Sequence, residues 1–499
     1  MRPNPLILII DENASFAHEI SDRLDEFECK IADCRSNVAG AAKALGARLI
    51  ILGCGVRAAD ALQTRLDLKG DPETAAIPIL VLGSRNSMTQ PEWALDLGTD
   101  VYLQKAHLDD YLRSHARMLL TRPAPPRYPV DPNRSVLSLL CLPQGTAFHL
   151  SGSIRCTETG GSPIRPSDYD GFAKEPLDPE DPEWRKTPAK WGQTIYNQLF
   201  ASDGKLLSFY HSASEHAVDD PSLLCIRVAA PLDYLRVPFE FLYNGGTPRG
   251  EPYFALRHPF SRSIVARETR TPALSTRLLN HLSETGEDLR ILLIGSSPLQ
   301  DPSSVDEEIR TLQERLPQWF SAKGVRVPPP DVIPSDQATF NTVKSALERT
   351  TAHIIHIACH GKFDERDPGR SCLRFLDDED GTSAKLLTAN DLGGALARNW
   401  AKNVQFVYLA CCDGSTAAGS DMIGQTDVLG LSDALVFGGV PAVLSHRIPP
   451  MDSRAPGFAI SFYRHLAASG DLELALFKTR KETDKTLPES LSPVLICQR

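Results

Sequence analysis

The sequence has no apolar run long enough to cross a membrane. A membrane-spanning helix needs about 20 consecutive apolar residues, and no stretch of the 499 residues reaches that length. Near the N-terminus only five apolar residues, 6–10, precede Asp11, and this run is shorter than the core of a secretory signal. We therefore expect a cytoplasmic protein that makes no use of a membrane.

Two signatures of nucleotide and nucleic-acid binding are also missing. There is no glycine-rich phosphate-binding loop and no extended basic patch with interleaved aromatic residues. The 53 basic and 63 acidic residues give a formal net charge of −10, which does not favour nucleic acid. We expect neither a nucleic-acid partner nor a cofactor.

The eleven cysteines lack the paired spacing of a disulfide framework, and their number is odd. In a reducing compartment most of them are expected to be small, buried, apolar residues. A cysteine that follows a buried strand is a different case, because it can be held at the edge of a sheet.

Two apolar runs end in reactive side chains beside a glycine. Residues 353–361 read His-Ile-Ile-His-Ile-Ala-Cys-His-Gly, and residues 407–415 read Val-Tyr-Leu-Ala-Cys-Cys-Asp-Gly-Ser. Functional groups collect beyond the carboxyl ends of parallel strands. If the two strands are neighbours, His360 and a cysteine meet at one edge, as a base and a nucleophile must.

Strand alternation separates the two cysteines. Successive side chains point to opposite faces, so Cys411 completes the buried strand and Cys412 begins the functional loop. We predict that Cys412 is the nucleophile. We also predict that Gly361 lets the chain turn sharply after His360, so that its N–H, with the N–H of Cys412, stabilises an oxyanion.

A metal site is the rival interpretation of the first motif, because His353, His356, Cys359 and His360 are close in sequence. A strand cannot gather them. His353 and His356 face opposite sides, and His356 and His360 lie about 13 Å apart along one face. Ligand atoms of one zinc ion each lie about 2 Å from it. We predict no metal, and core or strand-edge positions for His353 and His356.

The hydrophobic pattern predicts an α/β protein in several parts. Strands and helices alternate over residues 1–120, which indicates a doubly wound parallel sheet. The proline-rich residues 121–135 predict a linker. Residues 136–285 contain strands with a long polar loop at 160–191, and 286–499 alternate again, with a last helix over 455–483.

The first part resembles a response-regulator receiver domain, with a flavodoxin-like fold. Asp11 and Glu12 match the acidic pair of that family, and Lys105 matches its lysine. Gly53 stands where the family has its phosphate-accepting aspartate, and glycine cannot accept a phosphoryl group. The resemblance therefore implies a pseudo-receiver without a phosphoacceptor, used for docking or dimerisation.

Residues 136–499 resemble the CHAT-domain peptidases, bacterial relatives of caspases and separase. The two reactive motifs carry the resemblance, supported by matches at 238–240, 386–392 and 432–445. It implies a caspase-like α/β fold in which 136–285 is a non-catalytic counterpart and 286–499 is catalytic. It also implies a cysteine endopeptidase that cleaves one or a few partner proteins.

The same resemblance suggests substrate-binding residues. Ser445, His446 and Arg447 stand where family members shape the edge that pairs with an extended substrate, although ordinary strand-end roles are the alternative. Asp413 either favours a basic residue at the cleaved bond or caps the following turn. Asp391 and Asp364 are expected to be structural.

Family members often act in bacterial stress or anti-phage circuits. We therefore expect protein substrates encoded nearby, and a protein activator or inhibitor. The alternative is a catalytically silent scaffold that binds partners through both modules, since the missing phosphoacceptor already indicates one decayed site.

Overall fold

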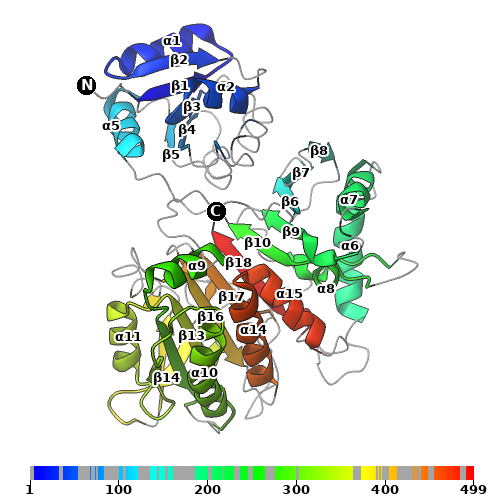
Figure 1. The fold of residues 1–499 in the computed structure, drawn as a ribbon, viewed down its shortest axis with the longest axis vertical. Coiled ribbons are helices and arrows are strands. Elements are labelled where there is room, and N and C mark those ends of the chain that lie inside the picture. The colour runs from blue at the N-terminus through cyan, green and yellow to red at the C-terminus, as the bar shows by residue number, and fades with distance from the viewer. Residues whose placement is uncertain are drawn as a thin grey trace. The chain divides into compact units, whose positions relative to one another are not determined.

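The computed structural model (Figure 1) describes residues 5–32, 37–53, 64, 68, 73–74, 77–83, 101–104, 108–121, 135–142, 145–151, 156–160, 186–200, 205–215, 217, 219–229, 237–245, 251–264, 276–298, 303–362, 372–381, 383–388, 391–392, 395, 404–412, 431–432, 435–436, 440–447, 454–483 and 490–498. The chain divides into two compact units, one of residues 1–134, 149–157 and 265–268, and one of 135–148, 158–264 and 269–499. Within the described ranges, no helix is both long and apolar enough to span a bilayer.

The first unit contains a parallel sheet with a hydrophobic core on each face. Its strands are β1 (Leu6–Ile10), β2 (Glu28–Ala32), β3 (Leu49–Leu52), β4 (Ile79–Gly83) and β5 (Val101–Gln104), in the order β2-β1-β3-β4-β5. Helices α1 (Ala14–Arg23) and α5 (Leu108–Thr121) pack on one face, and α2 (Val38–Leu45) packs on the other. This strand order is the flavodoxin-like one, which confirms the predicted fold class.

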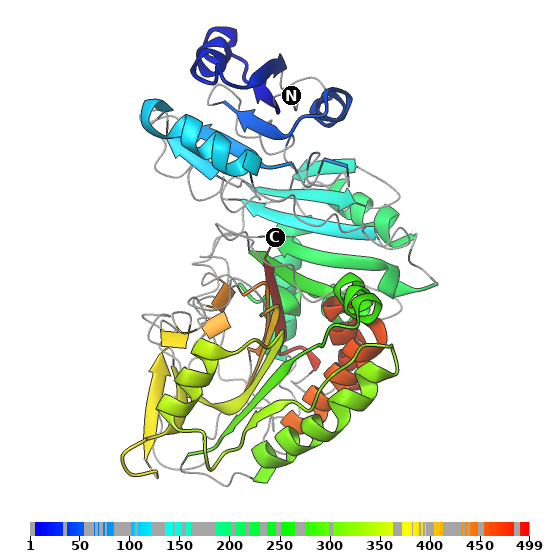
Figure 2. The same ribbon diagram turned by 60° about the vertical axis from the view of Figure 1, so that its left-hand side comes forward.

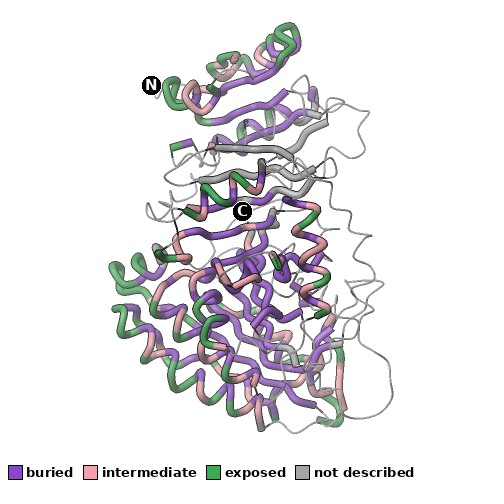
Figure 3. The backbone as a smooth tube through the Cα atoms, turned by 90° about the vertical axis from the view of Figure 1, so that its right-hand side faces the viewer, coloured by how far each residue is buried: buried purple, intermediate pink, exposed green. Residues whose placement is uncertain are grey.

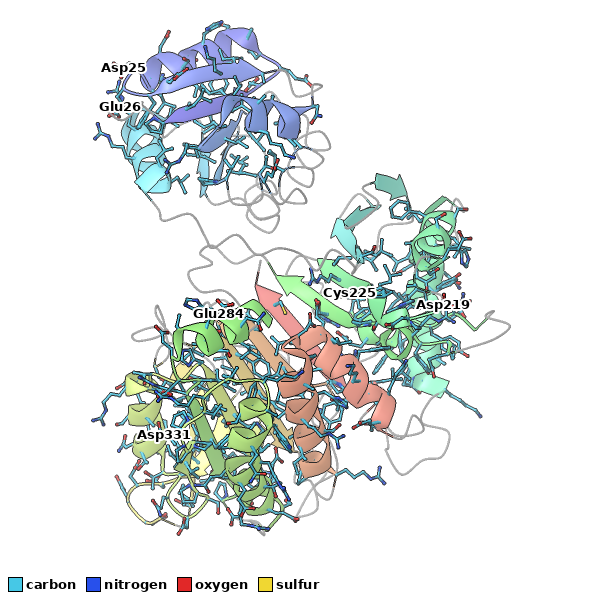
Figure 4. All side chains as sticks on the ribbon, viewed as in Figure 1. Asp25, Glu26, Asp219, Cys225, Glu284 and Asp331 are labelled. Atoms are coloured by element: carbon cyan, nitrogen blue, oxygen red, sulfur yellow. The ribbon has the colours of Figure 1, made fainter. Side chains whose placement is uncertain are left out.

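Helix α5 is joined to the segment after α1 by two ion pairs. Arg113 lies 3.0 Å from Asp25, and Arg117 lies 2.7 Å from Glu26, both measured between nitrogen and oxygen. Figure 4 labels the two carboxylates at one end of this unit. Both pairs are largely exposed, so each stabilises the fold by less than about 1 kcal/mol, and the packed core contributes more.

The second unit contains most of one long mixed sheet, whose strands β7 and β8 also include residues assigned to the first unit. Its main path runs β12-β11-β13-β16-β17-β18-β10-β9-β6-β7-β8. The strands are β6 (Ser135–Leu142), β7 (Gly145–Ser151), β8 (Cys156–Gly160), β9 (Leu224–Ala229), β10 (Phe260–Ile264), β11 (Ile291–Ser296), β12 (Asp331–Ile333), β13 (Ile354–Lys362), β16 (Phe406–Cys412), β17 (Ala442–His446) and β18 (Pro493–Gln498). Strands β14 (Cys372–Leu376) and β15 (Ala384–Thr388) form a hairpin beside the end of β13.

Helices cover both faces of the part of this sheet that residues 286–499 form. On one face, α10 (Ser303–Ser321), α14 (Ala455–Ser469) and α15 (Leu472–Glu482) pack in one core with the strands, and α9 (Thr276–Thr285) joins them. On the other face lies α11 (Phe340–Arg349), in a second core. The helices of the first face lie together in Figure 2, and Figure 3 shows the central strands as buried.

Helices also cover the earlier strands of the second unit. Helix α6 (Lys186–Phe200) packs against the short 3-10 helix η6 (Phe239–Phe241), and α7 (Lys205–Glu215) lies next to α6 and β6. A short helix, α8 (Phe254–Arg257), and a 3-10 turn, η4 (Pro221–Leu223), complete this part. Strand β10 is parallel to both β9 and β18, so residues 136–285 and 286–499 share one hydrogen-bonded sheet.

Two predictions of local structure are wrong. The helix expected over 455–483 is two helices, because Gly470 ends α14 in the left-handed region (φ 67°) and the Asp471 side chain accepts the N–H of Leu474 to cap α15. The polar loop expected over 160–191 ends earlier, since α6 begins at Lys186. The predicted linker at 121–135 lies almost wholly outside the described residues.

Candidate active site

The two strands that carry the reactive motifs are neighbours. Strands β13 and β16 are parallel over seven residue pairs, and the last pair is His360 opposite Cys412. Neighbouring strands lie roughly 4.8 Å apart, so the two backbones are separated by one strand spacing. The prediction that the histidine and cysteine strands meet at one edge is confirmed at the level of the backbone.

The apolar character of both strands explains this placement. Ile355, Ile357 and Cys359 pack into the core of the α11 face, whereas Ile354 and Ala358 pack under α10 and α14. Because both faces of β13 are covered, the strand is apolar nearly throughout. His360 stands at its carboxyl end, beyond the buried His356 and Cys359.

His360 is almost fully buried, with an exposed fraction of 5%. Its Nε2 lies 3.3 Å from the hydroxyl oxygen of Ser297, which directly follows β11. This contact orients the imidazole ring. Sequence reasoning missed Ser297, although it is the first residue after the buried strand next to β13, at the same sheet edge.

Cys412 is the last residue of β16, and its side chain lies outside the described part of the structure. Its predecessor, Cys411, is the register partner of Cys359. Cys359 is buried in the core of the α11 face. The register therefore keeps the two predicted cysteines in different rows of the sheet, one opposite buried Cys359 and one opposite His360.

The sharp turn predicted at Gly361 is wrong. Strand β13 continues through Gly361 to Lys362, and these two residues pair with Leu373 and Cys372 of β14. Gly361 is also not among the described glycines with positive φ. Its predicted function as an oxyanion donor stays a prediction.

His356 is a core histidine, as predicted. Its Nε2 lies 2.9 Å from Glu308 of α10, and its Nδ1 lies 3.3 Å from the Tyr463 hydroxyl of α14. The ring packs edge-on against Tyr408 at 5.0 Å between centroids. These contacts join both covering helices to the central strands.

His353 directly precedes β13, and its Nδ1 accepts the backbone N–H of Arg290 at 3.0 Å. Burial, and then the charge of Arg290, lower the pKa of His353 below its ordinary value. Across the described ranges, no three His, Cys, Asp or Glu side chains gather as a metal site would require.

The three residues predicted to shape the substrate edge are inside the protein. Ser445, His446 and Arg447 have exposed fractions of 0%, 1% and 1%. Ser445 accepts a hydrogen bond of 2.8 Å from Ser432, and His446 Nε2 lies 3.0 Å from the Tyr408 hydroxyl. Strand β17 is also paired on both sides, with β16 and with β18.

Burial determines the protonation of His446. Burial first, and then Arg480, lower its pKa to about 3, so the ring is neutral at physiological pH. Arg447 lies 3.9 Å from the buried carboxylate of Glu240. The side chains of residues 445–447 are buried inside the protein. A direct contact with substrate would therefore have to come from their backbone, or these side chains would have to move.

The other predicted residues divide into two groups. Asp391 is structural, because its carboxylate accepts the Thr388 hydroxyl at 2.7 Å and its own N–H donates to the oxygen of Thr388 at 3.1 Å. Asp413, Asp364 and Lys105 lie outside the described residues.

In the acidic pair of the first unit, the Asp11 carboxylate already makes contacts within the protein. The Asp11 carboxylate accepts the N–H of Asn13 at 2.7 Å. A β-carbon built on Gly53 would come within 1.8 Å of Oδ2 of Asp11. Asp11 therefore fills the space that a side chain at the expected phosphoacceptor position would need.

Comparison with known proteins gives one family. The family model of the CHAT domain matches residues 192–488, which is more than half of the chain. No curated protein matches the sequence.

Several solved structures of response regulators are similar to the N-terminal region. A chemotaxis response regulator from Vibrio cholerae is 21% identical, with 23% of this chain and 98% of that chain covered and a TM-score of 0.21. A response-regulator receiver domain from Francisella is 20% identical (24% and 98% covered, TM-score 0.21). The receiver domain of a histidine kinase from Syntrophus aciditrophicus is 22% identical (26% and 98% covered, TM-score 0.22).

Proposed function

Because this chain belongs to the CHAT-domain family, which is related to caspase-like peptidases, we propose that it is a cysteine endopeptidase. Cys412 is the nucleophile and His360 is the base. The observation that carries the proposal is the register of β13 and β16, which sets these two residues opposite each other at the carboxyl edge of a parallel sheet.

The proposed reaction is acyl transfer in two steps. His360 takes the proton of the Cys412 thiol, and the sulfur attacks the carbonyl carbon of the substrate peptide bond. The resulting oxyanion is stabilised by backbone N–H groups, for which those of Gly361 and Cys412 are candidates. His360 then gives its proton to the leaving amine, and a water molecule, deprotonated by His360, releases the acyl product.

Ser297 supports this assignment of His360. Its hydroxyl fixes the direction of a ring that is nearly inaccessible to solvent. Alternation along β16 gives further support, since Phe406, Tyr408 and Ala410 pack in the same core as Ile354 and Ala358 of β13. Continued to position 412, this alternation assigns the nucleophile to the sheet face of His360.

The first unit has a regulatory role in this proposal. Its flavodoxin-like sheet lacks a carboxylate at position 53, so phosphorylation cannot occur there, and docking or dimerisation is the remaining use of the module. The substrates are proteins encoded near this chain, a partner protein switches the enzyme on or off, and the pathway is one of stress or anti-phage defence.

The decisive experiment compares fragments. Wild type, Cys412→Ala and Cys411→Ala are each co-expressed with the proteins encoded beside this chain, and fragments are identified by mass spectrometry. Wild type and Cys411→Ala are expected to produce the same fragments, and Cys412→Ala none of them. Identical patterns for wild type and Cys412→Ala would rule out the peptidase and favour the silent scaffold.

A further inference from the structure

The sheet that carries His360 continues sideways onto the β14–β15 hairpin. Gly361, which follows His360, pairs with Leu373, and Leu373 pairs with Leu387. These three residues form one row across β13, β14 and β15. At roughly 4.8 Å per strand, β14 lies about 5 Å and β15 about 10 Å from the end of β13.

Alternation shows which hairpin side chains share the face of His360. Leu373, Phe375 and Leu387 are buried in the core of the α11 face, together with Cys359. Side chains next to them in sequence point to the other face. Arg374 and Leu386 are such neighbours and form a register pair, and His360 is the corresponding neighbour of Cys359.

Arg374 is tied to the site through its backbone. Its carbonyl oxygen accepts the hydroxyl of Ser296 at 3.0 Å, and the next residue, Ser297, contacts His360. The Arg374 side chain is half-buried, and its guanidinium forms no hydrogen bond or ion pair with any residue that the structure describes. A cation with no carboxylate partner in the described part of the chain therefore lies one strand from the proposed base.

Leu386 is the second side chain of this hairpin face, beside Arg374. Its exposed fraction is 44%, and the other exposed large apolar side chains among the described residues, Ile31 and Leu45, both belong to the first unit. Among the residues that the structure describes, Leu386 is thus the exposed large apolar side chain of the second unit, on the same face as His360 and beside Arg374.

We propose that the face of the β14–β15 hairpin formed by Arg374 and Leu386 binds the substrate chain next to the cleaved bond. It sets a preference for an acidic residue and, farther from that bond, for an apolar residue. The inference rests on the proposed peptidase function. Arg374 pairs with the acidic residue, and Leu386 contacts the apolar residue. An extended peptide advances about 3.3 Å per residue, so offsets of about 5 and 10 Å from the end of β13 correspond to roughly two and three residues counted from His360.

The test uses a library of ten-residue peptides with Glu, Gln or Lys at each position, incubated with the full chain and analysed by mass spectrometry. Wild type is expected to cleave peptides with Glu at one position about fivefold to tenfold faster than the same peptides with Lys, as a partly exposed charge pair allows. Arg374→Glu reverses this preference, and Leu386→Asp removes the preference for an apolar residue at the next position outward.

Two controls keep the result specific. Arg315→Glu changes an exposed arginine on α10, and Leu45→Asp changes a leucine of matched exposure in the first unit. Neither is expected to alter the preferences. An unchanged preference in Arg374→Glu overturns the hairpin proposal, even if cleavage still requires Cys412.

Binding provides a second readout that does not need turnover. The Cys412→Ala chain is titrated against a fluorescein-labelled peptide with the acidic and apolar residues, and against its Glu-to-Lys version, at low and high salt. Tighter binding of the acidic peptide at low salt, lost in Cys412→Ala/Arg374→Glu, supports the proposal. Equal binding of both peptides contradicts it. Failure of the peptidase itself is seen separately, as cleavage that survives Cys412→Ala.

Discussion

Glu240 and Arg262 form a two-point ion pair inside the second unit, with Nε–Oε1 at 2.7 Å and Nη2–Oε2 at 2.5 Å. Both side chains are almost inaccessible to solvent. Burial would by itself raise the pKa of Glu240, but Arg262 and then Arg447 outweigh it and hold that pKa below its ordinary value. One carboxylate thus joins β10, the helix η6 and the end of β17.

Removing this carboxylate should weaken the whole second unit. Glu240→Ala leaves Arg262 and Arg447 buried near each other without the charge between them, and a buried pair broken in this way costs about 3–5 kcal/mol. The urea midpoint of the second unit is expected to fall sharply. Glu314→Ala breaks an exposed pair with Arg310 and should lower the free energy of unfolding by less than about 1 kcal/mol. An equal loss of stability in Glu240→Ala and Glu314→Ala would show that burial of the ion pair does not determine its contribution.

The contact between Gly53 and Asp11 predicts that no side chain is tolerated at position 53. Gly53→Ala would place its β-carbon 1.8 Å from Oδ2 of Asp11, and relief by movement in a packed site costs about 1–3 kcal/mol. Thermal unfolding of the full chain should show a less stable first unit. In Asp11→Gly/Gly53→Ala most of this loss should be recovered, since the two residues are in contact. Additive losses would contradict the contact.

The same contact bears on phosphorylation. Gly53→Asp is not expected to restore a receiver, because Asp11 already occupies the space of the new side chain. Neither wild type nor this variant should gain the mass of a phosphoryl group within residues 1–119 after incubation with acetyl phosphate. Uptake by wild type at any site in this range would overturn the assignment of a pseudo-receiver.

The apolar strands were predictable, and so was the pairing of His360 with Cys412. Strands β1, β3, β13 and β16 are buried on both faces, so each is a continuous apolar run that stands out in the sequence. Because each reactive motif ends such a run, parallel packing was enough to bring the two residues together.

The features that could not be predicted from the sequence are an exposed edge strand and contacts between residues far apart in the chain. Strand β2 is an edge strand with no fully buried residue, so Glu28–Ala32 has no apolar pattern. The burial of Arg447 depends on Glu240, some two hundred positions earlier. The strand through Gly361 depends on pairing with β14. No local pattern encodes contacts of this range.

Two buried histidines, His446 and His258, should make the stability of the protein fall at acidic pH. Burial and then Arg480 lower the pKa of His446 to about 3, and burial is the main cause that lowers the pKa of His258 to about 4. In the unfolded chain both pKa values are about 6.5. As pH falls from about 6.5 towards 4, the unfolded chain takes up protons that the folded chain does not, so stability is lost.

The size of this loss approaches about 1.4 kcal/mol per pH unit for each histidine. His446→Gln removes one of the two contributions, so the melting temperature of the variant should fall less steeply between pH 6 and 4.5 than that of wild type. His211→Gln changes an exposed histidine and should leave the slope unchanged. Parallel slopes for wild type and His446→Gln would show that His446 does not act in this way.

Two glycines at opposite ends of α14 should respond in opposite directions to the same substitution. Gly470 ends the helix at φ 67°, a left-handed conformation that costs a residue with a β-carbon roughly 1 kcal/mol. Gly457 lies inside the helix, and a β-carbon there meets no atom within 4 Å. Gly470→Ala is therefore expected to lower stability by about 1 kcal/mol, and Gly457→Ala to raise it by about 0.5–1 kcal/mol. Thermal unfolding of the two variants beside wild type measures both signs, and a stabilised Gly470→Ala would mean that α14 and α15 form the continuous helix that the hydrophobic pattern alone predicts.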